Sequence, residues 1–210
     1  MFLTKILEER KSKFNGDVRV VKTLGMGTYI QANGLTQSGG IVSTMWQSTL
    51  SKIRSTKSEI RNVLILGLGG GTVAKLIRKN WPQAEITGID IDPIMVELGK
   101  KYLDLDKLGV QVTVRDASNL SNLPNHPNQK YDLIIVDLYN GDKFPKKFET
   151  DNYIHLVSSL LARSGVAVFN RLYYKEKKIE AEEFGKKLNK VFKNVESFRP
   201  VSNIMYICTN

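Results

Sequence analysis

Cysteine and histidine are scarce in this chain of 210 residues, which contains one cysteine, Cys208, and two histidines, His126 and His155. A single cysteine cannot form an internal disulfide, and so few thiol and imidazole groups make a Cys/His zinc site implausible. Neither histidine stands in a recognisable partner motif. We therefore expect no metal and no histidine-based catalysis.

Long apolar runs are also lacking, because no segment approaches the roughly 20 residues that span a bilayer as a helix. The first residues, MFLTKILEERKSK, have neither the apolar stretch nor the cleavage site of a signal peptide. The hydrophobic content of 41% and the charged content of 25% are ordinary for a globular protein. We expect a cytoplasmic protein with no membrane partner.

Acidic residues are outnumbered, since 31 Lys and Arg face 21 Asp and Glu and give a formal net charge of +10. Nucleic acid, an acidic protein or an anionic substrate would suit this charge. Base stacking would favour arginines interleaved with aromatic residues, and that pattern is missing. We interpret the lysines as a solvated surface and keep nucleic-acid binding as the less favoured alternative. The clusters are Lys143, Lys146 and Lys147; Lys175, Lys177 and Lys178; and Lys186, Lys187, Lys190 and Lys193.

The first quarter of the chain predicts a small β unit. Residues 1–15 suggest a short amphipathic helix or a loose arm, and a β pattern then runs from Asp17 to about Ser38. Turn signals at Gly25–Gly27 and at Asn33-Gly34 divide this pattern into three short strands. A helix is expected over residues 41–58, as the link to the rest of the chain.

We divide the chain into an N-terminal β unit with its linking helix, 1–55, and an α/β domain, 56–210. In the second part apolar strands alternate with helical patterns, which is typical of a parallel sheet with helices on both faces. A final strand pair at the edge would complete a mostly parallel seven-stranded sheet. The expected strands are 62–66, 84–89, 110–114, 131–136, 166–170, 194–198 and 203–208; the expected helices are 71–80, 93–103, 149–162 and 176–191, with a loop over 117–130.

A glycine-rich turn between two predicted strands is the most informative segment. Residues 62–92 read NVLILGLGGGTVAKLIRKNWPQAEITGIDID, in which Gly67, Gly69, Gly70 and Gly71 follow the first strand and Asp90 ends the second. Glycines let the backbone approach a ligand, and the acid can accept hydrogen bonds from ribose hydroxyls. The segment predicts a Rossmann-like site for a cofactor that carries a nucleoside.

Three successive strands of the main domain end at an aspartate: Asp90, Asp116 and Asp137. Ligands of open α/β sheets bind outside the carboxyl ends of the strands, so these carboxylates should lie on one rim. Unpaired buried charge is costly, which suggests that a ligand satisfies them. Asp92 is interpreted differently, as an N-cap residue, because it precedes Pro93 and a helix.

S-adenosylmethionine, or its decarboxylated form, suits three such carboxylates because it offers ribose hydroxyls, an adenine amine and a cationic sulfonium. An NAD-type dinucleotide would favour a third glycine where Thr72 stands, and a pyrophosphate over the start of the helix. The glycine pattern does not forbid NAD, but we prefer the adenosyl cofactor.

Several segments resemble the spermidine synthase-like branch of the class I S-adenosylmethionine-dependent methyltransferase fold. They are VLILGLGGGTVAKLI, GIDIDPIMVELGKKYL and YDLIIVDLYNGDKFP. The earlier segment NGLTQSGGIVSTMWQSTL is similar to the family's small hairpin with a glutamine and an aromatic–glutamine pair, here Gln37, Trp46 and Gln47. The resemblance covers roughly residues 17–170 and implies a Rossmann-like α/β fold. Members often dimerise, so a homodimer through the N-terminal β unit is also implied.

The resemblance implies roles for the cofactor-binding positions. Gly67, Gly69 and Gly71, with Gly70 in the same turn, would pass under the methionine part of the cofactor. Asp90, followed by Ile91, would bind the ribose hydroxyls, and Asp116 would bind the adenine amine beside Ala117. Asp137 would lie at the reacting centre. The candidates for the acceptor pocket are Gln37, Trp46, Gln47, Tyr139 and Asn140, although core packing is an equal alternative for Trp46.

Two acids of the family's aminopropyltransferases are missing here. Those enzymes have an aspartate inside a GGGDGG-like turn and another at the end of a DSSD-like run. This chain has GLGGGT, with Gly70 at the first position, and DLYN, with Asn140 at the second. Both carboxylates would help to hold amines, so their absence counts against polyamine chemistry. The run NGDKFP instead resembles the DGDxxP form of members that are not expected to make polyamines.

These observations favour an S-adenosylmethionine-dependent transferase, most of all a methyltransferase. The sulfonium already activates the methyl group, so the protein has chiefly to align donor and acceptor, and Asp137 can accept a proton from an acceptor amine. Aminopropyl transfer from decarboxylated S-adenosylmethionine is the second hypothesis, and a non-catalytic binding protein is the third. The acceptor, a small molecule or a protein, is not identified by the sequence.

Overall fold

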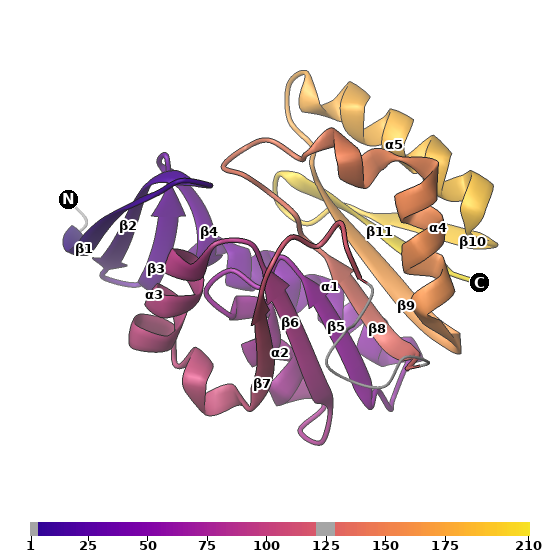
Figure 1. Ribbon diagram of the computed structural model, residues 1–210, viewed down its shortest axis with the longest axis horizontal. Helices are drawn as coiled ribbons and strands as arrows, with labels where there is room; N and C mark the ends of the chain where they lie inside the picture. Colours follow the sequence, from indigo (N-terminus) through magenta and orange to yellow (C-terminus); the bar gives the residue numbers. More distant parts are fainter. Residues whose placement is uncertain (1–3, 121–128) are drawn as a thin grey trace.

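The computed structural model describes residues 4–120 and 129–210 and contains two β-sheets connected by helices (Figure 1). The strands are β1 (Thr4–Ser12), β2 (Gly16–Thr23), β3 (Gly27–Ala32), β4 (Leu35–Gly39), β5 (Asn62–Leu66), β6 (Glu85–Asp90), β7 (Val110–Val114), β8 (Tyr131–Val136), β9 (Leu161–Leu172), β10 (Asn194–Phe198) and β11 (Asn203–Thr209). The helices are α1 (Gly40–Thr56), α2 (Thr72–Asn80), α3 (Pro93–Leu103), α4 (Asp151–Leu160) and α5 (Lys177–Val191), with short 3-10 turns η1 (Leu105–Leu108) and η2 (Lys146–Glu149). No helix in the described part of the chain is long and apolar enough to cross a membrane.

The larger sheet has the strand order β10-β11-β9-β8-β5-β6-β7, and the smaller one has the order β1-β2-β3-β4. Strands β5 to β9 pair in parallel, whereas β10 and β11 add an antiparallel edge. The smaller sheet is antiparallel throughout. The predicted α/β fold, with a mostly parallel seven-stranded sheet and an N-terminal β unit, is therefore confirmed.

Helices cover both faces of the larger sheet because its central strands are apolar on both sides. On β5, Leu64 and Leu66 face the layer of α4 and α5, while Val63 and Ile65 face the layer of α1 and α2. This alternation follows from the two-residue period of a strand. Helix α1 thus belongs to the core of the larger sheet, although the boundary after residue 55 itself stays a prediction.

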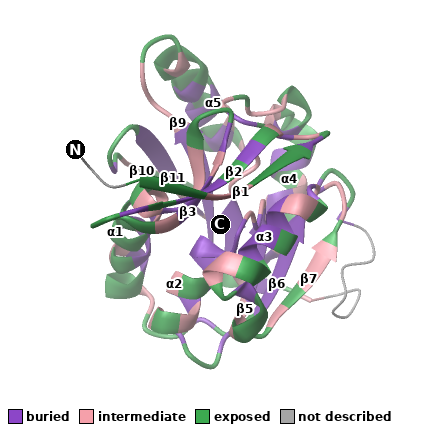
Figure 2. Cartoon of the chain, turned by 90° about the vertical axis from the view of Figure 1, so that its left-hand side faces the viewer, coloured by how far each residue is buried: buried purple, intermediate pink, exposed green. Residues whose placement is uncertain are grey.

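The prediction of a helix or a loose arm for residues 1–15 is wrong, because Thr4–Ser12 forms strand β1 and pairs with β2. The strand is mostly exposed at the edge of the smaller sheet (Figure 2). Its charged side chains contact α3: Glu8 accepts hydrogen bonds from Lys101 Nζ at 2.6 Å and Tyr102 Oη at 2.7 Å. These tertiary contacts outweigh the helix propensity of the Leu, Glu, Arg and Lys residues in the segment.

One other predicted segment differs from the structure, and one falls largely outside the described residues. The helix expected over 149–162 is shorter, because Thr150 Oγ1 caps α4 by accepting from Tyr153 N and the chain enters β9 at Leu161. The loop expected over 117–130 contains residues 121–128, with His126, which lie outside the described residues. His155 is exposed on α4.

Helix α3 packs unusually close to the glycine turn that follows β5. A Cβ atom at Gly99 would stand 2.6 Å from Gly70 Cα and 2.8 Å from its carbonyl oxygen, so the two backbones touch. The helix start is fixed by Asp92, whose Oδ1 accepts from Ile94 N at 2.9 Å, and Pro93 follows at the first helical position. The predicted N-cap role of Asp92 is confirmed.

Replacing Gly99 with alanine tests this contact. Alanine is the better helix former, yet its methyl group would collide with backbone that cannot move aside, so Gly99→Ala should lower the free energy of unfolding by about 1–3 kcal/mol. Urea denaturation measures this change. Lys100→Ala, at the next and exposed position of α3, is the matched control and should stay within about 0.5 kcal/mol of the parent. Equal effects of the two substitutions would refute the close contact.

Candidate active site

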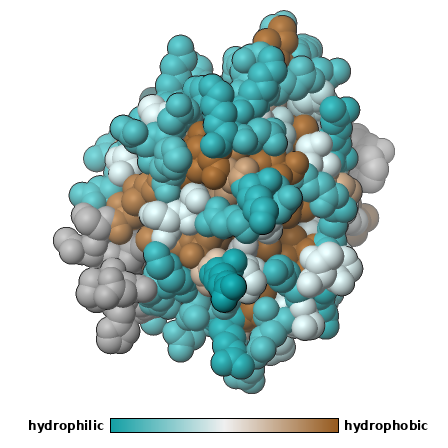
Figure 3. All heavy atoms as spheres, turned by 90° about the vertical axis from the view of Figure 1, so that its right-hand side faces the viewer, coloured by the Kyte–Doolittle hydropathy of each residue, from teal (hydrophilic) through white to brown (hydrophobic). Residues whose placement is uncertain are grey.

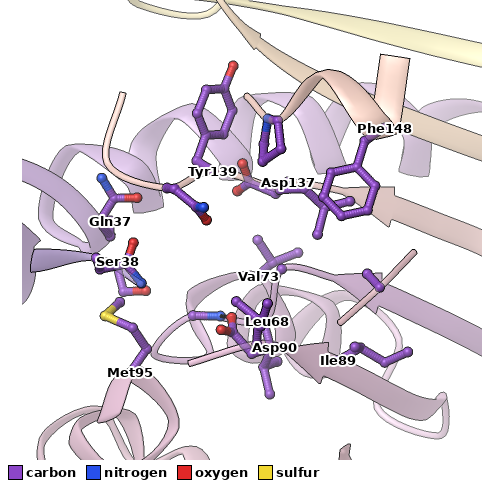
Figure 4. A pocket seen from close by; sticks show the side chains of 18 of the residues that line it. Gln37, Ser38, Leu68, Val73, Ile89, Asp90, Met95, Asp137, Tyr139 and Phe148 are labelled. Atoms are coloured by element: carbon purple, nitrogen blue, oxygen red, sulfur yellow. Dashed lines mark hydrogen bonds between the residues drawn. The ribbon is translucent and has the colours of Figure 1, made fainter. Parts of the chain in front are cut away.

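The carboxyl ends of β5, β6, β7 and β8 open into one cavity beneath the N-terminal sheet (Figure 4). Most residues predicted from the sequence line it: Gln37, Gly67, Gly69, Asp90, Ile91, Asp116, Ala117, Asp137, Tyr139 and Asn140. Figure 4 shows Asp90 and Asp137 on opposite sides of the same space. The structure therefore brings these positions together, and their binding roles stay predictions.

The glycine turn begins with a contact that no other residue type would allow. Gly67 has a φ of 89°, and a Cβ atom there would lie 2.0 Å from the carbonyl oxygen of Asp137. Gly67 N and Leu68 N both donate to Ile89 O, at 2.9 and 3.0 Å. The absence of a side chain thus lets the ends of β5, β6 and β8 meet, which places Asp137 directly beside the turn.

The N-terminal sheet closes the other side of the turn. Gly70 N donates to Ser38 Oγ at 2.8 Å, and Gly39 N donates to Thr72 Oγ1 at 2.7 Å. A Cβ atom at Gly70 would lie 2.8 Å from both Ile30 Cδ1 and Leu103 Cδ1. Gly70 and Gly71 do not line the cavity. They belong to the side of the turn that packs against neighbouring side chains.

Asp90 is buried and already receives two backbone donors. Gly69 N donates to its Oδ2 at 2.6 Å and Asp92 N to its Oδ1 at 2.9 Å. Burial raises the pKa of Asp90 to about 6, since the loss of water outweighs these hydrogen bonds, and the nearby negative charges of Asp92 and Asp137 raise it further. Ligand hydroxyls that donate to this carboxylate would therefore relieve a real electrostatic cost.

Asp116 has a partner that the sequence did not reveal. Its Oδ1 accepts from Ser118 N at 2.8 Å, and its Oδ2 forms an ion pair with Lys147 Nζ. Partial burial raises the pKa of Asp116, but the hydrogen bonds from Lys147 and Ser118 outweigh it and leave the pKa below its usual value. Lys147 also lines the cavity, so one member of a predicted surface cluster lies at the candidate site.

Asp137 is held between two side-chain donors. Trp46 Nε1 donates to its Oδ2 at 3.2 Å, and Asn170 Nδ2 donates to its Oδ1 at 2.8 Å. Burial nevertheless raises the pKa of Asp137 to about 6. A carboxyl group with such a pKa can accept a proton near neutral pH, which is what a general base requires.

The predicted acceptor residues have different surroundings. Trp46 is fully buried in the core, donates a hydrogen bond to Asp137 and lines neither of the two cavities that Asp137 borders, so its place in an acceptor pocket stays a prediction. Gln47 is exposed on α1 and does not line the cavity. Tyr139 lines the cavity, and its hydroxyl accepts from Leu172 N at 2.8 Å. Burial raises the pKa of Tyr139, so this phenol stays neutral.

The loop after β8 is fastened to the N-terminal sheet. Gln37 Nε2 donates to Gly141 O at 3.2 Å, and Gly141 N donates to Asn15 Oδ1 at 3.4 Å. Asn15 Nδ2 donates in turn to Asp92 Oδ2 at 2.7 Å. The N-terminal sheet therefore positions the loop that carries Tyr139 and Asn140.

Sequence reasoning missed several residues of the site. Asn170 ends the fifth predicted strand, and the rule that identified the three aspartates would have identified it there. Lys147 and Phe148 lie on η2 and line the cavity. Apart from a lysine cluster, no pattern in this segment predicts a site. Asn15 and Ser38 come from the N-terminal sheet, where the position of each depends on tertiary packing and no local pattern marks them.

The raised pKa of Asp137 predicts how stability depends on pH. An unfolded aspartate titrates near 3.9, so between about pH 4 and pH 6 the folded state binds the extra proton and stability falls as pH rises. A shift of this size corresponds to about 2–3 kcal/mol over that interval. Asp137→Asn should reduce, by this amount, the fall in unfolding free energy between pH 4 and pH 6. Urea denaturation from pH 4 to pH 7 measures this change. An unchanged slope would show that Asp137 is not desolvated.

Comparisons with known proteins identify the family to which this chain belongs. Residues 45–203 match the family model described as the spermine/spermidine synthase domain. A polyamine aminopropyltransferase of Vibrio vulnificus is 29% identical over 133 residues, which are 60% of this chain and 44% of that protein. The eEF1A lysine and N-terminal methyltransferase homolog of Drosophila melanogaster is 27% identical over 161 residues, 71% of this chain and 23% of that protein. The chain spans less than half the length of either relative.

Solved structures show the same fold at low sequence identity. Spermidine synthase from Thermotoga maritima has a TM-score of 0.77 and 16% identity, covering 98% of this chain and 72% of that one. Human methyltransferase-like protein 13, in complex with SAH, has a TM-score of 0.61 and 20% identity, covering 80% and 79%. The fold is thus the Rossmann-like one of class I methyltransferases, and the family match over most of its length shows that this chain belongs to the spermine/spermidine synthase family.

Proposed function

We propose that this protein is a transferase that binds S-adenosylmethionine in the cavity and transfers its methyl group to an acceptor beside Asp137. The observation that carries the proposal is the convergence of Asp90, Asp116 and Asp137 around one glycine turn. A dinucleotide would also need room for a pyrophosphate at the start of α2, where Thr72 Oγ1 instead bonds to Gly39 N.

The three carboxylates can each receive a different part of this cofactor. Every carboxylate oxygen has a second lone pair, so Asp90 can accept ribose hydroxyls in addition to its two backbone donors. Asp116 would accept the adenine amine while Lys147 keeps it ionised. Phe148 and Ile89 also line the cavity, where they supply apolar surface. Asp137, whose oxygens already accept from Trp46 and Asn170, would lie on the side where the methyl group would leave.

Two features favour methyl over aminopropyl transfer. The position of the family's acid within the glycine turn is Gly70, and the space beside it is filled by Ile30, Leu103 and Ser38. Asn140, at the position of the second acid, is neutral and exposed. Carboxylates that would hold an aminopropyl group and a polyamine are therefore absent from both of these positions.

Ligand-induced stabilisation tests the cofactor directly. At about 100 times its Kd, S-adenosylmethionine should add about 2.7 kcal/mol and raise the melting midpoint by roughly 5–11 °C. Decarboxylated S-adenosylmethionine, methylthioadenosine and NAD complete the panel. The proposal fails if no adenosyl ligand shifts the midpoint.

Substitution of Asp90 tests the ribose assignment. Asp90→Ala removes the carboxylate that would accept the ribose hydroxyls, so the thermal shift with S-adenosylmethionine should disappear while the protein stays folded, as judged by circular dichroism. Asp106→Ala, at an exposed acid on η1, is the matched control and should bind normally. Equal affinity of the Asp90 variant and the parent would place the ribose elsewhere.

The second candidate, aminopropyl transfer, has the family membership in its favour. Incubation with putrescine and decarboxylated S-adenosylmethionine should yield no spermidine by mass spectrometry, because neither missing acid is present to bind the amines. Detection of spermidine with enzymatic turnover would make aminopropyl transfer the better assignment.

The third candidate, a binding protein without activity, would gain support from its basic surface. The chain carries a formal net charge of +10, and hydrophilic side chains cover much of the face seen in Figure 3, with hydrophobic ones exposed between them. Steeply salt-dependent binding of nucleic acid without turnover would favour this candidate. Nucleic-acid binding and a homodimer both stay predictions.

A further inference from the structure

We infer that the methyl acceptor is a small molecule with one amine group on an apolar body, and that it binds in a second cavity beside Asp137. The inference rests on the proposed methyl transfer and names the substrate class for it. The second cavity shares Gln37, Val42, Asp137 and Tyr139 with the first. A molecule there would reach Asp137 from the side opposite the glycine turn.

The inner end of this second cavity provides one negative charge. Asn203 Nδ2 donates to Asn170 Oδ1 at 2.8 Å, and Asn170 Nδ2 donates to Asp137 Oδ1 at 2.8 Å, so two amides orient the carboxylate. Among the described residues that line the cavity, Asp137 is the sole acid. One ammonium group can therefore be paired here, whereas a second one would be desolvated without a partner.

The acid that follows Asp137 most closely in the chain does not add a second negative charge to the cavity. Asp142 follows Gly141, but it lines a separate small hollow together with Glu180, Arg171 and Lys177. Two cations balance the two acids of this hollow, and neither acid lines the second cavity, so Asp142 adds no negative charge where the acceptor would bind. A diamine in the second cavity would thus have one paired and one unpaired end.

The outer end of the cavity is apolar. Leu35, Ile41 and Val201 lie at it with exposed fractions of 40%, 45% and 62%. They are three of the eight exposed large hydrophobic residues in the described part of the chain, and Val201 joins Leu35 and Ile41 from a distant part of the sequence. Such gathering of exposed apolar side chains marks a binding surface more often than chance exposure does.

The backbone at Val201 supports a functional role. Its φ is 54°, in the left-handed region that a β-branched residue strongly disfavours. The turn is fixed around it, because Asn203 N donates to Pro200 O at 3.1 Å and Tyr173 N donates to Ser202 O at 2.8 Å. Glycine would fit this conformation better, so the strained valine makes its side chain a candidate for contact with the acceptor.

The transfer step is chemically balanced with these groups. The lone pair of the neutral acceptor amine forms a bond to the methyl carbon, and the carbon–sulfur bond breaks with its electron pair remaining on sulfur. The sulfonium becomes a neutral thioether, and the nitrogen becomes positively charged. Before this step the Asp137 carboxylate accepts a proton from the bound ammonium group, which makes the amine neutral, and Asp137 later passes that proton to water.

A matched pair of probes tests the charge argument. Hexylamine and 1,6-diaminohexane have the same chain, but only the second carries another ammonium group. Calorimetric titration in saturating S-adenosylhomocysteine should show hexylamine binding at least tenfold more tightly. Equal or tighter binding of the diamine, or no binding of either amine, would overturn the inference. If S-adenosylmethionine gives a thermal shift in the same preparation, that failure leaves the proposed cofactor site intact; if it gives none, both proposals fall.

Val201→Gly separates the role of the side chain from the fold. Glycine removes the apolar group and relieves the left-handed strain, so the melting midpoint should stay equal or rise while hexylamine affinity falls about three- to tenfold. Ile179→Ala, at an exposed apolar residue of α5 that does not line the cavity, is the control and should leave the affinity unchanged. Unchanged hexylamine affinity in the glycine variant would show that Val201 does not contact the acceptor.

Discussion

The close packing of backbone around the glycine turn is the constraint on which the site depends. Gly67 contacts the carbonyl of Asp137, Gly70 contacts Gly99 of α3, and Ser38 of β4 lies against both Gly69 and Gly70. Each contact occurs at a distance that a Cβ atom would prevent. The turn therefore holds the end of β8, helix α3 and strand β4 in fixed positions. The cavity is the space that remains beside it.

The three aspartates at the strand ends around this turn differ in their hydrogen-bond partners and in their pKa values. Asp116 is paired with Lys147 and is readily ionised, while Asp90 is buried among backbone donors and Asp137 among side-chain donors. The difference comes from their partners, because all three lie at or just beyond the carboxyl ends of parallel strands. Asp116 and Asp90 are thus suited to receiving donors from a ligand, and Asp137 is suited to exchanging a proton.

The sequence predicted what depends on local pattern and on the sheet rule. The larger sheet and the edge that carries the site could be predicted from three features: the apolar strands, the glycine turn and the aspartates at the strand ends. Strand β1 escaped prediction because its pairing and its contacts to α3 are tertiary. Gln47 and Trp46 are adjacent in the chain, yet the turn of helix α1 sends one outward and the other into the core, a distinction that a motif cannot make.

The missing acid of the glycine turn is itself a consequence of packing. An aspartate at residue 70 would have to displace Ile30 of β3, Ser38 of β4 and Leu103 of α3. Those residues fasten the N-terminal sheet, which in turn holds the loop with Asn140 through Gln37 and Asn15. An aspartate in the glycine turn would therefore require the N-terminal sheet to move. The packing around Gly70 and the position of the loop with Asn140 are thus linked features of one arrangement, because the same N-terminal sheet contacts both.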